Sequence, residues 1–241
     1  MNSQGTAKSV AVDAATFDAL RALDTPTVCN ALEMLESGRR SYGFTTEQLF
    51  CLRPEMPAIV GFAKTATVRS LRPSRESGDE VIMHRASYYR YVGDGPLPKV
   101  CVMQDLDGVN AGYGAFWGTF NSSIHRALGC EGVITDGAIR DIQKIPVGFQ
   151  MIARAVRPSH AFVHIVDFGI TVNVCSMVVC DGDLIHADVH GAVCFPPTLV
   201  GAVLAAAKDF IESERPIIEA CAMPDITIDQ VLEIYTRRVS R

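Results

Sequence analysis

One stretch, residues 118–141, constrains the fold of this chain more than any other. It reads GTFNSSIHRALGCEGVITDGAIRD, which predicts a helix, a buried strand over 132–135 and a turn at Asp136–Gly137. A helix followed at once by a buried strand favours an α/β architecture. The inner face of the predicted helix consists of apolar residues, namely Phe120, Ile124, Ala127 and Leu128.

The segments on either side of this stretch differ in character. Before it, predicted helices and strands alternate, at residues 13–23, 25–38, 58–71, 79–92 and 99–104. After it, short β segments predominate, at residues 147–155, 161–174, 177–179, 184–187 and 192–195. This order predicts an α/β domain whose central sheet is folded back or barrel-like and flanked by helices.

The predicted C-terminal part is helical. Thr198 is expected to cap a long helix that Pro216 interrupts, and Thr227 with Gln230 forms a capping box for the last helix. The sequence contains no internal repeat and no low-complexity linker. We therefore expect one domain over 1–241, in which 1–12 is a loose N-terminal segment and 216–241 a C-terminal helical extension.

The composition limits the class of function. Hydrophobic residues make up 48% of the chain and charged residues 20%, which provides enough apolar material for a sizeable core. The net charge of -5 and the absence of a long basic run argue against nucleic acid as a partner. No apolar run is long enough for a membrane span. The eight cysteines form no C-x-x-C pair, so we expect buried free thiols and a cytoplasmic protein.

Arg140 and Asp141 are the first candidates for chemistry. An arginine presents a planar fork of donors to a carboxylate, and an aspartate is a hard oxygen ligand that suits Mg²⁺. Gly118 precedes a helix whose free N–H groups favour an anion. The pattern therefore predicts a pocket for a small carboxylate and a metal, although a surface ion pair and an ordinary glycine-rich helix entry would produce the same sequence.

Other polar residues are weaker candidates. Asp105 with Asp107 at a strand end, and Arg39 with Arg40 in a loop, fit a ligand site but fit a plain turn or solvated charges better. Two histidine pairs, His160 with His164 and His186 with His190, permit a metal site, but solvated or hydrogen-bonded histidines explain them better. The chain has no nucleotide-binding glycine motif, no nucleophile elbow and no lysine suited to a Schiff base.

Several motifs resemble one known family. They are GFAKTATVRS, GCEGVITDGAIRD, PVGFQMIARAVRPS and CDGDLIHADVHGAVCFP, and the resemblance extends from about Thr25 to Ala207. The chain is similar to the class II pyruvate aldolases that cleave 4-hydroxy-4-methyl-2-oxoglutarate, a family that includes the regulator of ribonuclease E activity A (RraA). In the last motif, Asp181 stands where the family usually has proline.

The resemblance implies an αββα-type sandwich, a homotrimer or dimer of trimers, and active sites between subunits. It implies that Asp141 and water molecules hold Mg²⁺ or Mn²⁺. Arg140 would bind the oxygen atoms of a pyruvate-like enolate, and the backbone N–H groups of Gly118, Thr119 and Phe120 would bind its carboxylate. The activity so implied is a metal-dependent lyase that releases pyruvate from a small 2-oxo acid, with oxaloacetate decarboxylation as a related activity.

The chain departs from the family at one catalytic position. Family aldolases carry the spacing Asp-x20-Arg-Asp, and Thr119 occupies the first position here. A threonine hydroxyl is a poor base at neutral pH. Two alternatives therefore remain beside the aldolase: an enzyme of altered reaction type, such as a hydratase, isomerase or other lyase, and a non-catalytic protein that regulates a ribonuclease.

Overall fold

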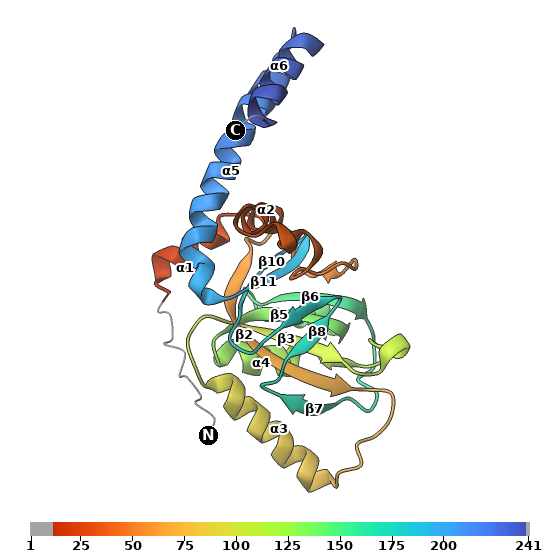
Figure 1. The fold of residues 1–241 in the computed structure, drawn as a ribbon. Coiled ribbons are helices and arrows are strands. Elements are labelled where there is room, and N and C mark those ends of the chain that lie inside the picture. Colours follow the sequence, from red (N-terminus) through yellow and green to blue (C-terminus); the bar gives the residue numbers. More distant parts are fainter. Residues whose placement is uncertain (1–11, 240–241) are drawn as a thin grey trace.

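The computed structural model describes residues 12–239, and it consists of a folded sheet between two groups of helices (Figure 1). The predicted loose segment at 1–12 lies almost wholly outside these residues. The helices are α1 (Ala14–Arg21), α2 (Thr25–Leu35), α3 (Gly78–Gly93), α4 (Thr119–Ala127), α5 (Val200–Cys221) and α6 (Ile228–Val239).

The nine-stranded sheet has the order β1-β6-β5-β3-β2-β10-β11, with β4 paired to β5 and β7 paired to β2. The four central strands β6, β5, β3 and β2 run parallel to one another, as does β4 beside β5. The outer pairings of β1, β7, β10 and β11 are antiparallel. The strands are β1 (Phe50–Cys51), β2 (Ile59–Arg69), β3 (Lys99–Asp105), β4 (Ala115–Trp117), β5 (Cys130–Ile139), β6 (Gln150–Val156), β7 (His164–Phe168), β10 (Leu184–Asp188) and β11 (Gly191–Phe195).

A separate two-stranded ribbon, β8 (Val172–Val174) with β9 (Met177–Val179), fills the inside of the folded sheet. Its apolar residues pack with inward-facing residues such as Val100, Val102 and Ile134 in one core. The alternate residues Cys101, Met103 and Val133 face α3 and α4 in a second core. The predicted mixed α/β class with a barrel-like sheet between helices is confirmed.

The third core lies under α1, α2 and α5. Asp13 caps α1 as predicted, by accepting a hydrogen bond from the Thr16 amide at 2.8 Å. The predicted cap at Thr25 is one residue late, because the Asp24 side chain caps α2. The predicted cap at Thr198 is also wrong: Thr198 lies within a short 3₁₀ turn, Pro197–Leu199, that precedes α5.

Helix α4 presents a different face from the one that its apolar residues predict. Its buried residues are Asn121, Ser122 and His125, while Phe120 is 68% exposed. The polar groups are tolerated inside because each has a partner; the Ser122 hydroxyl, for example, donates to the Gly118 carbonyl at 2.8 Å. The rotation of the helix places Phe120 at the surface of the molecule.

Asp136–Gly137 is not the predicted turn, since β5 continues through it to Ile139. The pairing with β6 shifts register between Thr135 and Ala138, which is typical of a bulge. Local hydrogen bonds satisfy the irregular backbone: the Gly137 amide donates to the Thr135 hydroxyl, and the Asp105 amide donates to Asp136. The strand therefore ends at Ile139, four residues beyond its predicted end, and Arg140 follows it directly.

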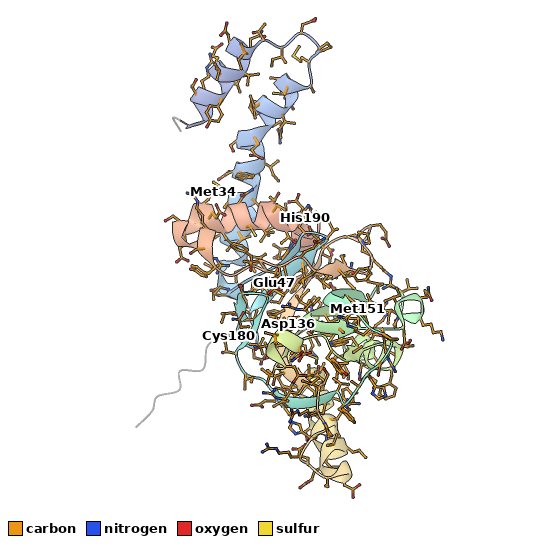
Figure 2. All side chains as sticks on the ribbon, turned by 90° about the vertical axis from the view of Figure 1, so that its right-hand side faces the viewer. Met34, Glu47, Asp136, Met151, Cys180 and His190 are labelled. Carbon is orange, nitrogen blue, oxygen red and sulfur yellow. The ribbon has the colours of Figure 1, made fainter. Side chains whose placement is uncertain are left out.

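The C-terminal part of α5 and helix α6 form an arm that stands clear of the sheet (Figure 2). Pro216 does not interrupt α5, which runs on to Cys221. A proline removes one helical hydrogen bond, and here the unpaired carbonyl of Glu212 lies on an exposed part of the helix, where water can replace the donor. The predicted capping box of Thr227 and Gln230 is present before α6.

All eight cysteines are free thiols, as predicted. Four of them are buried, whereas Cys180 and Cys221 are exposed and contradict the expectation of general burial. Among residues 12–239, no helix has the length and apolar character needed to cross a membrane.

Candidate functional site

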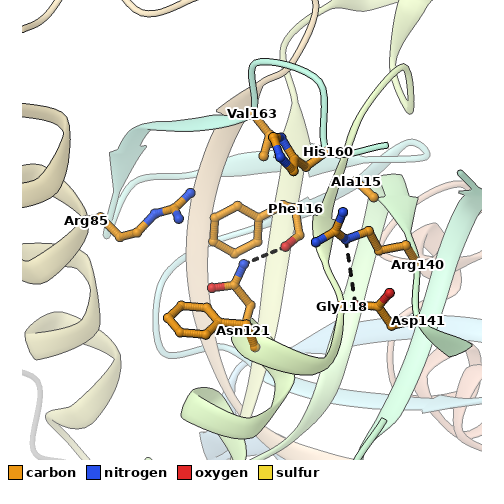
Figure 3. Close-up of a pocket in the computed structure, with 10 residues that line it drawn as sticks. Arg85, Ala115, Phe116, Gly118, Asn121, Arg140, Asp141, His160 and Val163 are labelled. Atoms are coloured by element: carbon orange, nitrogen blue, oxygen red, sulfur yellow. Dashed lines mark hydrogen bonds and ion pairs between the residues drawn. The ribbon is translucent and has the colours of Figure 1, made fainter. Parts of the chain in front are cut away.

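A cavity of about 290 Å³ lies where strands β4, β5 and β6 end together (Figure 3). Because the three strands are parallel, the segments that follow them meet at one edge of the sheet. Gly118 follows β4, Arg140 follows β5, and the loop with His160 follows β6. Four of the five predicted site residues line this cavity: Gly118, Phe120, Arg140 and Asp141.

Asp141 connects the end of β5 to the start of α4. Its Oδ2 atom accepts a hydrogen bond from the Thr119 amide at 3.2 Å and lies 3.7 Å from Arg140 Nε. The residue adopts the left-handed conformation, with φ of 56°, which turns the chain sharply after the strand. This turn, followed by the short helical piece Ile142–Lys144, brings two adjacent side chains into one cavity, as the sequence predicted.

Position 118 needs a glycine because no room is left for a side chain, and not because of its backbone conformation. Its φ of -161° is ordinary extended backbone. However, a Cβ at this position would lie 2.7 Å from Asp141 Oδ2 and 3.0 Å from Arg140 Cγ. The absence of a side chain thus lets the charged pair approach the first turn of α4.

Thr119 contributes little surface to the cavity. Its hydroxyl is buried and makes no hydrogen bond with any residue from 12 to 239, and its amide is occupied by Asp141. The next two amides of the helix, those of Phe120 and Asn121, donate to no other described residue. These two N–H groups at a helix start are the donors that remain available to an anion.

The Asn121 side chain is fixed at the cavity wall. Its Oδ1 accepts a hydrogen bond from the Tyr89 hydroxyl at 2.7 Å, and its Nδ2 donates to the Phe116 carbonyl. With both ends of the amide engaged, the orientation of Asn121 is determined by the protein and not by a ligand.

The cavity also contains Arg85 from α3 and His160, neither of which was predicted as part of this site. His160 lies within hydrogen-bonding distance of the Ala161 carbonyl through Nδ1, at 2.6 Å. A carbonyl only accepts, so Nδ1 carries the proton and Nε2 is free to accept one. The sequence offered the pairing of His160 with His164, but His164 lines a different cavity, beside Arg69 and Asp107.

The remaining candidates are engaged in the structure. Arg39 donates to the Cys194 carbonyl, and Arg40 pairs with Glu33 at 3.2 Å. His186 is buried between the Thr25 hydroxyl and the Leu20 carbonyl, and burial lowers its pKa. His190 contacts Asp188 at 3.1 Å. Within residues 12–239, no group of three histidine, cysteine or acidic residues is arranged to hold a metal.

Asp105 and Asp107 are likewise engaged. The carboxylate of Asp107 accepts hydrogen bonds from the Ser70 and Leu71 amides at 2.7 and 2.9 Å. Burial alone would raise the pKa of Asp107, and these bonds outweigh it, so the net shift is downward. Asp105 accepts from the Asp107 and Gly112 amides, but burial dominates and raises its pKa.

Comparison with solved structures supports the fold. An uncharacterized protein from Pseudomonas syringae pv. tomato matches over 95% of this chain and 98% of its own, with a TM-score of 0.72 and 20% identity. RraAS2 from Streptomyces coelicolor, described as an unusual member of the RNase ES inhibitor RraA protein family, matches over 86% of this chain and 96% of its own. Its TM-score is 0.67 and its identity 19%.

Comparison of sequences identifies the family. A protein of Methanocaldococcus jannaschii without a described function is 30% identical over 107 residues, which span 44% of this chain and about half, 51%, of that relative. The profile of the RraA-like family, described as Aldolase/RraA, matches residues 25–194 and thus most of the chain. The chain belongs to the RraA-like family.

Proposed function

We propose that this protein is a divalent-metal-dependent lyase that acts on a small 2-oxo acid and releases pyruvate. The observation that carries the proposal is the convergence of Arg140, Asp141 and the start of α4 on one cavity. Arg140 binds the oxygen atoms of the 2-oxo acid, and the free amides of Phe120 and Asn121 receive its carboxylate.

Asp141 fits the metal that the family implies. Its Oδ1 atom makes no hydrogen bond or ion pair with any described residue, so one hard oxygen faces the cavity. Mg²⁺ needs only one or two protein carboxylates and keeps several waters, and Mn²⁺ accepts the same ligands. When bound, the metal would act as a Lewis acid on the 2-oxo group.

The chain's own groups account for the remaining steps. When the carbon–carbon bond breaks, its electron pair moves onto the 2-oxo oxygen, and the Arg140 guanidinium stabilises the enolate that forms. His160 Nε2 accepts the proton of the substrate hydroxyl group in an aldol cleavage. The same proton then passes to the terminal carbon of the enolate, which completes the methyl group of pyruvate.

The position of Thr119 supports a second candidate, an enzyme of altered reaction type on the same scaffold. Its hydroxyl is buried and makes no hydrogen bond with the described chain, so no protein group assists it in taking a proton from a substrate. A Thr119→Asp variant separates the two candidates. A large gain in aldolase activity would indicate that the natural protein has moved away from that reaction.

The test of the proposal is an assay that couples pyruvate release to lactate dehydrogenase. The substrates are 4-hydroxy-4-methyl-2-oxoglutarate, 4-carboxy-4-hydroxy-2-oxoadipate and oxaloacetate, each with Mg²⁺ and with a chelator. We expect turnover with metal and loss of turnover in Arg140→Ala and Asp141→Ala, while Arg90→Ala, at an exposed position of α3, serves as the control. Absence of pyruvate from all three substrates would refute the proposal.

We further expect a homotrimer or a dimer of trimers in the cytoplasm. The arm supports an assembly, because α6 exposes Ile228, Leu232 and Tyr235 at helical spacing. Sedimentation equilibrium measures the mass of the particle, and a monomer at micromolar concentration would exclude both assemblies. A pull-down against a ribonuclease E-type enzyme tests the non-catalytic alternative.

A further inference from the structure

The cavity contains a second cation that the proposed reaction does not use. Arg85 projects from α3, and its guanidinium lies over the Phe116 ring, 5.3 Å from the ring centre. Its Nε atom is buried without a hydrogen-bond partner. Arg85 also forms no ion pair with any residue in the described part of the chain.

Arg85 and Arg140 enter the cavity from opposite sides, with the Phe116 ring between them (Figure 3). Among the described residues, Asp141 is the one carboxylate that lines this cavity, and it lies beside Arg140. The Arg85 side therefore has an uncompensated positive charge. A half-buried guanidinium without a partner costs free energy, and this cost favours an anionic occupant on the Arg85 side.

We propose that Arg85 binds a second, distal carboxylate, so that the cavity selects 2-oxo dicarboxylic acids over 2-oxo monocarboxylic acids. This inference rests on the proposed function, because the 2-oxo end of the ligand is assigned to Arg140. The Phe116 ring holds the guanidinium from one face, which limits its rotation and leaves the edge donors to a planar partner. A carboxylate matches that fork with two parallel hydrogen bonds.

The arrangement divides the binding energy between the two ends of the ligand. Arg140 is common to every 2-oxo acid, whereas Arg85 contributes only when a second anion is present. A charge-assisted, two-point hydrogen bond in a half-buried site corresponds to about 10- to 100-fold in affinity. We expect 2-oxoglutarate to bind tighter than 2-oxopentanoate by about this factor, because the two ligands differ in the terminal carboxylate.

The test is isothermal titration of both acids, in the presence of Mg²⁺, against four proteins. These are the unaltered chain, Arg85→Met, Arg85→Lys and the control Arg90→Met, which removes an exposed cation from the same helix. We expect Arg85→Met to abolish the preference for 2-oxoglutarate and to leave 2-oxopentanoate binding within about twofold. Arg85→Lys should retain part of the preference, because lysine keeps the positive charge but cannot form the two parallel hydrogen bonds of a guanidinium. Arg90→Met behaves as the unaltered chain.

Three outcomes would overturn the inference. Equal affinity of the unaltered chain for both acids would refute the second carboxylate site while leaving the proposed function intact. Failure of both acids to bind would refute the proposed function as well. Tighter, Arg85-dependent binding of 2-oxo-4-phosphonobutanoate than of 2-oxoglutarate would assign the distal site to a phosphate-like group. Thermal melting of each variant confirms that it is folded.

Discussion

Two parallel strands, β3 and β5, each end near a pair of charged residues, and the two pairs differ in how many of their polar atoms have a partner in the protein. At the end of β3, every oxygen of Asp105 and Asp107 accepts a hydrogen bond from the protein. At the end of β5, the Arg140 side chain has one polar contact with the described residues, the 3.7 Å contact of its Nε with Asp141. The first pair fixes a loop, and the second pair has hydrogen-bonding groups directed at a cavity.

This difference indicates how a structural charge can be told from a functional one. Buried or half-buried polar groups normally find partners, so a group left without one either costs stability or awaits a ligand. Arg85, Arg140 and Asp141 all leave donors or acceptors free, and all three line the same cavity. Substitutions at the two strand ends should therefore separate loss of function from loss of stability.

The largest expected effect is that of Arg140→Met on turnover. Loss of one group that stabilises an enolate corresponds to about 100- to 1000-fold in the rate. The melting temperature should change little, because Arg140 makes only one long contact with a half-exposed carboxylate. If the variant releases pyruvate at a rate within a few-fold of the unaltered protein, Arg140 does not stabilise the enolate.

Asp107→Ala should show the opposite behaviour. It leaves the Ser70 and Leu71 amides without their acceptor, which costs about 2–4 kcal/mol of unfolding free energy. The cavity groups stay in place, so ligand affinity measured well below the melting temperature should be retained. Urea unfolding gives the free energy, and an unaltered midpoint would show that the hydrogen bonds of Asp107 do not stabilise the loop.

The pH dependence of stability tests the role of His125, a buried histidine with both ring nitrogens hydrogen-bonded. It lies on the buried face of α4, where Nδ1 donates to the Asn121 carbonyl and Nε2 accepts from the Tyr88 hydroxyl. Burial lowers its pKa from 6.5 to about 4. The unfolded chain thus binds the proton first, and the contribution of His125, about 3 kcal/mol, is present above pH 6.5 and is lost as the pH falls toward 4.

The measurement is urea unfolding at several pH values between 7 and 4. His125→Gln is the comparison variant, since it cannot titrate in this range. If both proteins lose stability to the same extent over this interval, another group is responsible for the pH dependence.

The smallest effect is expected for Gly118→Ala. The added Cβ would lie 2.7 Å from Asp141 Oδ2 and displaces the charged pair, for which we expect about tenfold weaker ligand binding. Gly201→Ala is the matched control, because a Cβ there meets nothing within 4 Å. Calorimetric titration with oxalate measures the affinity of both variants. Equal affinities would mean that ligand binding tolerates the displacement of Arg140 and Asp141.

The sequence predicts those parts of the fold that depend on local patterns. The strands over 58–71 and 99–104 and the helix over 79–92 agree with β2, β3 and α3 to within two residues. The pairing of Arg140 with Asp141 in one cavity was also predictable, because a short helical segment directly after the pair permits a turn there. The prediction failed at Asp136–Gly137, where hydrogen bonds from other segments keep the strand extended.

Features that depend on long-range contacts were not predictable. The inner face of α4 is polar because Tyr88 and the backbone supply partners for His125, and no local pattern indicates this. Arg85 lies 55 residues before Arg140 in the chain, on a helix whose sequence shows no site motif. His160 enters the site only because Gly114 lets its backbone approach; a Cβ there would lie 2.6 Å from the His160 carbonyl.

The most direct test of the central claim is calorimetric titration with oxalate, a planar mimic of the pyruvate enolate, in the presence of Mg²⁺. We expect saturable binding to the unaltered protein, binding to Asp107→Ala within a few-fold of it, and binding to Arg140→Met that is about 100-fold weaker. Equal binding of oxalate to the unaltered protein and to Arg140→Met, or no binding to either, would contradict the account.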